Sequence, residues 1–387
     1  MTTKPIVAAY YFPNYHVDPR NEADHGPGWT EWHLVRHATP RFPGHVQPLV
    51  PAWGYEDEAD PAVMARKIEA ASSHGIDAFL FDWYYYDETL FLERCLSDGF
   101  MKASNANAMK FSLMWANHDW GNCHPLRRGE KTVMSASGEI AGEAFEKMTD
   151  LIIERYFHHP SHLNVDGAPF FSLYSLNNLV KGFGGSLSQT RAALERFTLK
   201  TKRAGFPGLH LNAIGYNVQV LDGEMGKVSA YEAAKILGFS SIGNYVWAHF
   251  VPLSAPDFTR DYAEVKSEYM AALAKSQAQT TLPVFPNVTM GWDSSPRTLQ
   301  SDIWDKTYPY PWTQILAGNT PEQFRKALED VRDYAQARDL RMISLNAWNE
   351  WTEGSYLEPD TVNGLGYLEA IRSVFRDPQP GHKEAPE

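Results

Sequence analysis

Short β-prone segments alternate with helical patterns along the whole chain, and this alternation constrains the fold more than any other feature of the 387 residues. The predicted strands are apolar, often aromatic runs, at 6–12, 76–81, 110–116, 168–174, 209–215, 242–247, 282–288 and 342–345. The predicted helices follow them, at 61–74, 90–105, 143–157, 188–204, 229–237, 258–275, 321–338 and 366–375. Strand–helix alternation builds parallel sheets, and eight such units close into a barrel. The sequence therefore predicts an α/β protein with a single (β/α)₈ TIM barrel and elaborated loops over its C-terminal face.

Helix boundaries and the first turn support this prediction. Asp60-Pro61 is an N-cap followed by proline at the first helical position, and Thr320-Pro321 opens a capping box. A doubly wound open sheet is the structural alternative, and it favours a glycine-rich first turn. The first strand is followed instead by Pro13-Asn14-Tyr15-His16.

The sequence predicts a single domain. Residues 1–376 form the predicted catalytic barrel, and the polar, proline-rich residues 377–387 form a predicted flexible tail. No internal repeat or linker interrupts the pattern. The long segment 18–60 is expected to fold over the barrel mouth.

Charge and cysteine content exclude several classes of protein. The formal net charge of -12 argues against a nucleic-acid partner, and no apolar run is long enough for a membrane span. Cys95 and Cys123 are too few for a disulfide framework, so we expect free thiols and a reducing compartment. No signal peptide is apparent, which predicts a cytoplasmic protein unless an export signal precedes this sequence. The sequence leaves the oligomeric state open.

Aromatic residues are abundant: 12 Trp, 19 Tyr and 20 Phe. Many of them fill the core, but several Trp and Tyr stand beside polar residues at predicted strand ends. Aromatic faces stack on sugar C–H groups while polar groups bind the hydroxyls, so this pairing predicts a carbohydrate substrate. The candidate substrate-binding residues are Tyr10, Tyr11, Asn14, His16, Trp29, Glu31, Trp32, Gln47, Asp82, Trp83, Tyr84, Trp115, Asn117, His118, Asp119, Tyr174, Tyr216, Asn217, Tyr245, Trp247, Trp292, Trp348, Asn349 and Tyr356.

Glu350 and Glu353 are the candidate catalytic residues. Two glutamates three positions apart on a helical turn place their Cβ atoms ~5–6 Å apart. Retaining glycosidases hold their two carboxyl groups ~5–5.5 Å apart, and like charges at that distance raise one pKa, which yields an acid and a base. The alternative is two surface glutamates in the first turn of a helix. The flanking Trp348 and Trp351, directly after an apolar strand, favour a site.

Other chemistries lack their motifs. The histidines near the N-terminus match no metal-binding spacing, and no glycine-rich phosphate loop or G-x-S-x-G elbow is present. We therefore expect no metal and no cofactor. His118-Asp119 could bind substrate or assist proton transfer, or could form only a structural hydrogen bond. Asp82 could be catalytic or could cap the rim of the barrel.

Several long motifs resemble the WbsX-like proteins, over a stretch from Pro5 to about Ala370. The matching segments are 9–16, 28–32, 44–48, 75–84, 115–117, 346–354 and 357–360. They are also similar to the endo-α-mannosidase family of retaining glycoside hydrolases, which are (β/α)₈ barrels with an N-E-W-x-E-G motif. By position, the resemblance implies that Glu350 is the base and Glu353 the acid/base. It further implies that the base deprotonates the sugar 2-hydroxyl, which attacks C1 to give a 1,2-anhydro sugar intermediate.

Two departures from the family pattern leave the substrate open. Thr352 stands where the mannosidases tend to have His, and His118-Asp119 stands where WbsX-type relatives often have Glu. A retaining glycoside hydrolase acting on an oligo- or polysaccharide is the leading hypothesis. The alternatives are a glycosyltransferase of surface-polysaccharide biosynthesis, although no D-x-D triplet is present, and a non-catalytic carbohydrate-binding barrel. Sugar identity, linkage and endo or exo action stay open.

Overall fold

A parallel barrel forms the centre of the molecule. The computed structural model describes residues 4–122, 124–215, 221–223, 226–254, 257–305 and 308–376. Its main sheet has eleven strands among the described residues, and nine of them form a path in the order β14-β12-β9-β8-β4-β2-β1-β17-β15. All neighbours on this path are parallel. The strands are β1 (Ile6–Tyr11), β2 (Ala78–Tyr86), β4 (Lys110–Trp115), β8 (Ala168–Leu173), β9 (His210–Ile214), β12 (Ser241–Gly243), β14 (Val284–Phe285), β15 (Asn287–Thr289) and β17 (Met342–Asn346).

The two ends of this path, β14 and β15, are consecutive in the chain. Only Pro286 separates them, and proline has no N–H to donate to a ladder. Its carbonyl still accepts a hydrogen bond from Ser344 N in β17 at 2.9 Å. β14 and β15 are thus two halves of one interrupted seventh strand, and the predicted eight-stranded α/β barrel is confirmed.

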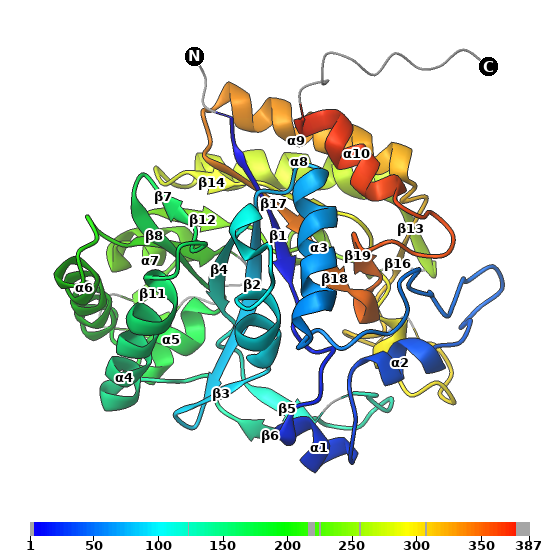
Figure 1. The fold of residues 1–387 in the computed structure, drawn as a ribbon, viewed down its shortest axis with the longest axis horizontal. Coiled ribbons are helices and arrows are strands. Elements are labelled where there is room, and N and C mark those ends of the chain that lie inside the picture. Colours follow the sequence, from blue (N-terminus) through cyan, green and yellow to red (C-terminus); the bar gives the residue numbers. More distant parts are fainter. Residues whose placement is uncertain are drawn as a thin grey trace.

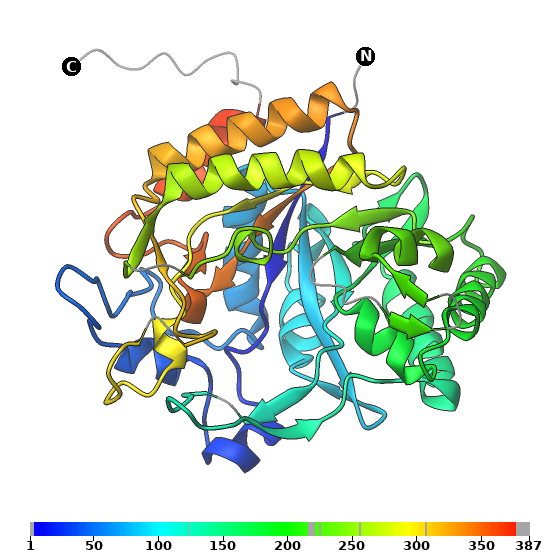
Figure 2. The same cartoon turned by 180° about the vertical axis from the view of Figure 1, so that it is seen from behind.

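Helices surround this barrel (Figures 1 and 2). They are α3 (Pro61–Ser73), α4 (Gly142–Ile152), α5 (Leu176–Gly182), α6 (Leu187–Arg203), α7 (Ala230–Leu237), α8 (Tyr262–Ala278), α9 (Pro321–Ala337) and α10 (Gly366–Phe375). The predicted caps form, since Asp60 accepts from Ala62 N at 2.8 Å and Thr320 from Gln323 N at 3.3 Å. In the part of the chain that the structure describes, no helix combines the length and apolar character needed to cross a membrane.

The helix predicted over 90–105 forms only in part. β2 continues to Tyr86, and β3 (Thr89–Phe91) folds back on it antiparallel, pairing Tyr84 with Phe91. The two turn residues Asp87 and Glu88 both have positive φ, 50° and 57°, as a tight hairpin turn requires. Only a short π-helix, η1 (Cys95–Phe100), and a 3₁₀ turn, η2 (Ala106–Ala108), follow.

The strand predicted over 242–247 is also shorter than expected. β12 ends at Gly243, residues 244–246 have no regular secondary structure, and a 3₁₀ turn, η4 (Trp247–His249), follows. Trp247 N donates to Thr289 Oγ1 at 2.9 Å, so the side chain of a neighbouring strand takes the place of a ladder partner there.

Loops gather at the end of the barrel where the strands terminate. Figure 1 shows α1 (Pro19–His25), α2 (Trp32–His37) and the hairpin β5 (Trp120–Asn122)–β6 (Val133–Ala136) at this end. Side chains carried on the strand ends and on these loops therefore meet there. The predicted tail, 377–387, lies outside the described residues.

Candidate functional site

The two candidate catalytic glutamates lie in a tight turn after β17. Glu350 ends β18 (Asn349–Glu350), and Glu353 ends the 3₁₀ turn η6 (Trp351–Glu353), before the chain returns as β19 (Ser355–Tyr356). Gly354 reverses the chain with φ of 61°, and a Cβ there would lie 2.7 Å from Asp293 Cβ, so the turn needs glycine. Glu350 and Glu353 are only 4% and 5% exposed, which rules out the surface-charge interpretation.

Arg297 is the cation of this site. It ends a 3₁₀ turn, η5 (Ser295–Arg297), and its guanidinium is buried. Its Nη1 lies 2.5 Å from Glu353 Oε1, its Nη2 lies 3.5 Å from Glu350 Oε1, and its Nε donates to Glu31 Oε1 at 3.1 Å. The Tyr310 hydroxyl donates to the same Glu353 oxygen at 2.7 Å.

The two glutamates have different surroundings. Burial, followed by repulsion from Glu353, raises the pKa of Glu350 well above its ordinary value, against the opposing effects of Arg297 and the Tyr245 hydrogen bond. Glu353 instead has both a short ion pair with Arg297 and a phenol donor. Burial therefore disfavours ionisation of Glu350, whereas Glu353 is paired directly with the Arg297 cation.

Tyr245 connects Glu350 to a third carboxyl group. Its hydroxyl lies 3.0 Å from Glu350 Oε2 and 2.9 Å from Asp82 Oδ2. Burial is the largest cause that raises the pKa of Asp82, and it does so far above the ordinary value. The Tyr10 ring lies 4.6 Å from the Tyr245 ring.

An aromatic wall continues from Tyr245. We give this name to Tyr84, His118, Trp120 and Tyr174. The His118 ring lies 5.8 Å from Tyr84 and 5.9 Å from both Trp120 and Tyr174, and the Tyr174 ring lies 5.6 Å from Tyr245. Burial lowers the pKa of His118, which favours an uncharged imidazole. Flat aromatic faces of this kind suit the C–H face of a sugar.

Asn14 and Thr352 contact the same carboxylate of the site, that of Glu31. Asn14 Nδ2 donates to Glu31 Oε2 at 2.6 Å, and the Thr352 hydroxyl bonds to the other Glu31 oxygen. Arg297 Nε also donates to Thr352 Oγ1 at 3.0 Å. Thr352, one of the departures from the family pattern, thus contacts the arginine that holds both glutamates.

Several predicted residues point away from this cluster because side chains alternate along a strand. Tyr10 and Asp82 face the site, so their neighbours Tyr11 and Trp83 face the surrounding helices. Tyr11 donates to Glu58 at 2.9 Å, and Trp83 Nε1 donates to the Tyr156 hydroxyl at 3.3 Å. The rings of Trp115, Trp247 and Trp348 also pack in the outer layer, against Phe145, Tyr262 and Phe79 respectively.

Other predicted residues shape the loops. Their contacts are Gln47 with Asp293, Asn117 with Ser175, Asp119 with Gly138, Asn349 with the Phe12 backbone, Tyr356 with Asp360, Trp32 with Glu56, Trp292 with Thr313, and Trp29 with His25. His16 is buried, and burial lowers its pKa to about 4. Tyr216 and Asn217 lie outside the described residues.

Sequence reasoning missed Arg297 and Tyr310. Neither follows a predicted strand directly or belongs to a motif that we singled out. A buried pair of carboxylates requires a cation, but the sequence does not indicate which of its 35 lysines and arginines supplies it.

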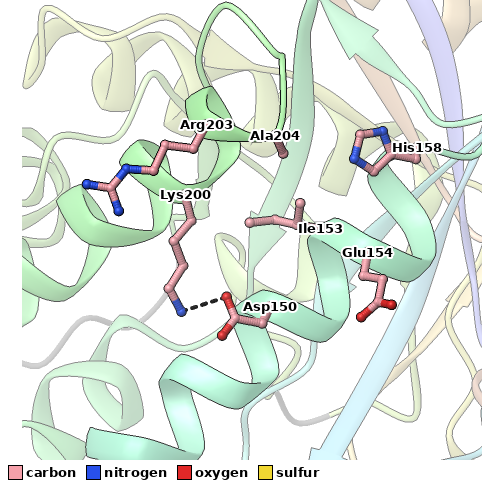
Figure 3. A pocket seen from close by; sticks show the side chains of 7 residues that line it. All are labelled: Asp150, Ile153, Glu154, His158, Lys200, Arg203 and Ala204. Atoms are coloured by element: carbon pink, nitrogen blue, oxygen red, sulfur yellow. Dashed lines mark ion pairs between the residues drawn. The ribbon is translucent and has the colours of Figure 1, made fainter.

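Two cavities lie elsewhere on the described surface. A groove of 420 Å³ lies in the outer helical layer, lined by Asp150 and Ile153 on one side and by Lys200 and Arg203 on the other (Figure 3). A smaller cavity of 180 Å³ is lined by Tyr15, Trp32 and other residues of 15–57. Neither is lined by Glu350 or Glu353. Within the described ranges, no group of three or more His, Cys, Asp or Glu has a metal-binding arrangement.

Comparison with known proteins agrees with the motif resemblance. The family model described as "Glycosyltransferase WbsX" matches residues 7–371. Two curated relatives from two strains of Xanthomonas campestris pv. campestris, both described as "Uncharacterized protein WxcX", are 28% identical to the chain over 391 residues. The match covers 97% of this chain and 50% of each relative, so the chain spans about half the length of the curated relatives it matches.

Solved structures with a similar fold include glycoside hydrolases. A GH99 endo-alpha-mannosidase from Bacteroides thetaiotaomicron has a TM-score of 0.56 at 12% identity, over 95% of both chains. A structure described as "Glycoside hydrolase-like protein" has a TM-score of 0.59 at 13% identity, over 98% of this chain and 96% of that one. At such low identity, these likenesses show a shared fold. Because the family model covers nearly the whole chain, the protein belongs to the family described as Glycosyltransferase WbsX.

Proposed function

We propose that this protein is a retaining glycoside hydrolase that cleaves an oligo- or polysaccharide, with Glu350 and Glu353 as its acid/base pair. One observation carries the proposal: the two buried glutamates in the turn after β17 have unequal surroundings, since burial raises the pKa of Glu350 whereas Glu353 is ion-paired with Arg297. Glycoside cleavage needs such a pair, because the leaving oxygen must be protonated while a second group accepts a proton.

The proposed roles follow the family resemblance: Glu350 is the base and Glu353 the acid/base. Glu350 takes the proton of the sugar 2-hydroxyl, whose oxygen attacks C1 as the C1–O bond breaks. Glu353 protonates the departing oxygen and then activates the water that opens the 1,2-anhydro sugar. The aromatic wall supports the substrate class, since it lies beside Tyr245 and offers faces for stacking.

The resting contacts impose two conditions on this cycle. Glu350 must be ionised to act as a base, and Glu353 must carry a proton to act as an acid. A proton and the Arg297 guanidinium cannot occupy the same position on the Glu353 oxygen, so the departing sugar oxygen must take the place of Arg297 there. We therefore expect the Arg297–Glu353 ion pair to open when substrate enters.

A substrate screen separates hydrolysis from transfer. The protein is incubated with aryl glycosides and oligosaccharides, and in parallel with nucleotide sugars plus manganese, with Glu353→Gln as the matched control. We expect free reducing sugar from at least one glycoside, no need for a nucleotide sugar, and no release by Glu353→Gln. Thermal stabilisation by a nucleotide sugar together with glycosyl transfer would establish the transferase instead, and binding of sugars without turnover would establish a carbohydrate-binding barrel.

A further inference from the structure

The Tyr245 hydroxyl has two carboxyl oxygens within hydrogen-bond distance and only one hydrogen to donate. Asp82 Oδ2 lies 2.9 Å away and Glu350 Oε2 lies 3.0 Å away. A phenol donates a single hydrogen bond and accepts others through its lone pairs. Full use of both contacts therefore requires that one of the two carboxyl groups carries a proton and donates it to the Tyr245 oxygen.

The surroundings of Asp82 favour a neutral carboxyl group. Its side chain is 4% exposed, and Oδ1 has no hydrogen-bond partner among the residues that the structure describes. An ionised carboxylate that is buried and half unpaired is costly, whereas a neutral acid leaves only a carbonyl oxygen unpaired. Several titratable or charged groups interact with Asp82 electrostatically or by a hydrogen bond. They are Tyr10, Tyr84, Tyr245, Arg297, Glu350 and Glu353.

Charge balance in the site leads to the same conclusion. Glu31, Asp82, Glu350 and Glu353 bring four carboxyl groups to one buried guanidinium, that of Arg297. Glu31 and Glu353 have the shortest contacts to that cation, at 3.1 Å and 2.5 Å. Asp82 and Glu350 are connected through Tyr245, and Arg297 stabilises a negative charge on them less strongly. A proton in this cluster is therefore most favourable on Asp82 or Glu350.

We infer that Asp82 and Glu350 share one proton through Tyr245, and that Asp82 stores this proton while Glu350 is ionised and can act as a base. In one state, Glu350 carries the proton and donates to the Tyr245 oxygen, while Tyr245 donates to ionised Asp82. In the other state, Asp82 carries the proton and donates to Tyr245, while Tyr245 donates to ionised Glu350.

The interconversion moves two protons in the same direction. The Glu350 O–H bond breaks as a new O–H bond forms on Tyr245, and the original Tyr245 proton passes to Asp82. Tyr245 is a phenol before and after, and the summed charge of the three groups is unchanged. The inference rests on the proposed function and deepens it: Asp82 acts through Tyr245, so it is a positioning residue that sets the protonation of Glu350.

An infrared measurement tests the location of the proton without requiring turnover. Wild-type protein is compared with Asp82→Asn, Tyr245→Phe and the control Tyr85→Phe, each with and without isotope-labelled aspartate carboxyl groups. Tyr85 is a suitable control because it follows Tyr84 on β2 and stacks on Trp83 in the outer layer. At neutral pH we expect a label-sensitive carbonyl band of a protonated aspartate, lost in Asp82→Asn, shifted in Tyr245→Phe and unchanged in Tyr85→Phe.

Kinetics on a cleaved glycoside test the connection to Glu350. If the two residues act in series, Asp82→Asn and Tyr245→Phe each lower kcat by about 10²-fold, and the double variant is no slower than the slower single one. A wild-type protein without the aspartate band, a band that persists in Asp82→Asn, or multiplicative losses in the double variant would overturn the inference. If no glycoside is cleaved by any variant, the proposed function fails, whereas the infrared result still decides whether Asp82 holds the proton.

Discussion

Arg297 Nη1 lies 2.5 Å from Glu353 Oε1, and both side chains are buried beneath the loops at the end of the barrel. The contact joins two turns that follow different strands, η5 after β15 and η6 after β17. It brings the cation of the site closer to Glu353 than to Glu350, whose Oε1 lies 3.5 Å from Arg297 Nη2.

Replacement of Arg297 is expected to damage both stability and activity. Arg297→Met leaves Glu31 and Glu353 buried without their cation, and breaking such pairs costs about 3–5 kcal/mol in the free energy of unfolding. Arg297→Lys restores the charge but not the planar fork, so we expect an intermediate loss. Urea unfolding of both variants measures this order. Arg196→Met, which removes a half-exposed ion pair with Glu146, is the control and should unfold like wild type. Equal stability of Arg297→Met and wild type would contradict the assigned role of the cation.

Glu350→Gln should change how stability depends on pH. Because the pKa of Glu350 is raised in the folded protein, the folded state binds more protons than the unfolded state above the ordinary carboxyl pKa of about 4.3. Wild-type stability should therefore fall as pH rises from this value toward the raised pKa. Glutamine mimics the neutral acid, so the variant should be more stable than wild type at pH 7 to 8, and the difference should shrink as pH falls toward about 4.3. Thermal unfolding across this range is the measurement. If the stability difference between Glu350→Gln and wild type grew as pH fell, the raised pKa of Glu350 would be contradicted.

We expect Lys67 to stabilise the fold without taking part in catalysis. It is buried beside the barrel in α3, 2.6 Å from Glu58 and 2.5 Å from Glu358. Glu58 also accepts from Asn349 Nδ2 at 2.8 Å, so this ion cluster fixes the start of the catalytic turn. Lys67→Met leaves two buried carboxylates without a cation and should lower the free energy of unfolding by about 3–5 kcal/mol.

The matched control for Lys67 is Lys147→Met, because Lys147 also pairs with two glutamates, Glu88 and Glu143, but on the exposed surface. No measurable change is expected there. Similar losses in the two variants would show that burial of the Lys67 cluster does not matter.

His118→Ala should weaken sugar binding if the aromatic wall stacks on substrate. Loss of one aromatic face is expected to raise KM by about fivefold to tenfold, equivalent to about 1 kcal/mol of stacking. Trp83→Phe is the control, since Trp83 faces the outer helical layer, and its KM should equal that of wild type. Steady-state kinetics on a cleaved glycoside measure both values. An unchanged KM in His118→Ala would place the sugar elsewhere.

The barrel and the position of the glutamate pair could be predicted from the sequence because both depend on local patterns. Strand–helix alternation gave the fold class, and the apolar run before Asn346 placed Glu350 and Glu353 at a strand end. The same two-residue period explains why only one of Tyr10 and Tyr11 reaches the site, although both were predicted for it. Applied strictly, alternation could have excluded Tyr11 and Trp83.

Contacts between distant segments could not be predicted in this way. Arg297 meets Glu31, which is 266 positions away in the sequence, because two loops converge over the barrel. The hairpin after β2 was missed for a related reason. Residues 89–91 have a partner in Tyr84–Tyr86, and this strand pairing outweighs the helical pattern of the segment.

The most direct test of the account is kcat/KM for wild type, Glu350→Gln and Glu353→Gln on one glycoside that wild type cleaves. Each substitution keeps the size of the side chain but removes its ability to exchange a proton. The account predicts a loss of about 10²–10⁴-fold in each variant, with the barrel still folded by circular dichroism. Cleavage at the wild-type rate by either variant would contradict it.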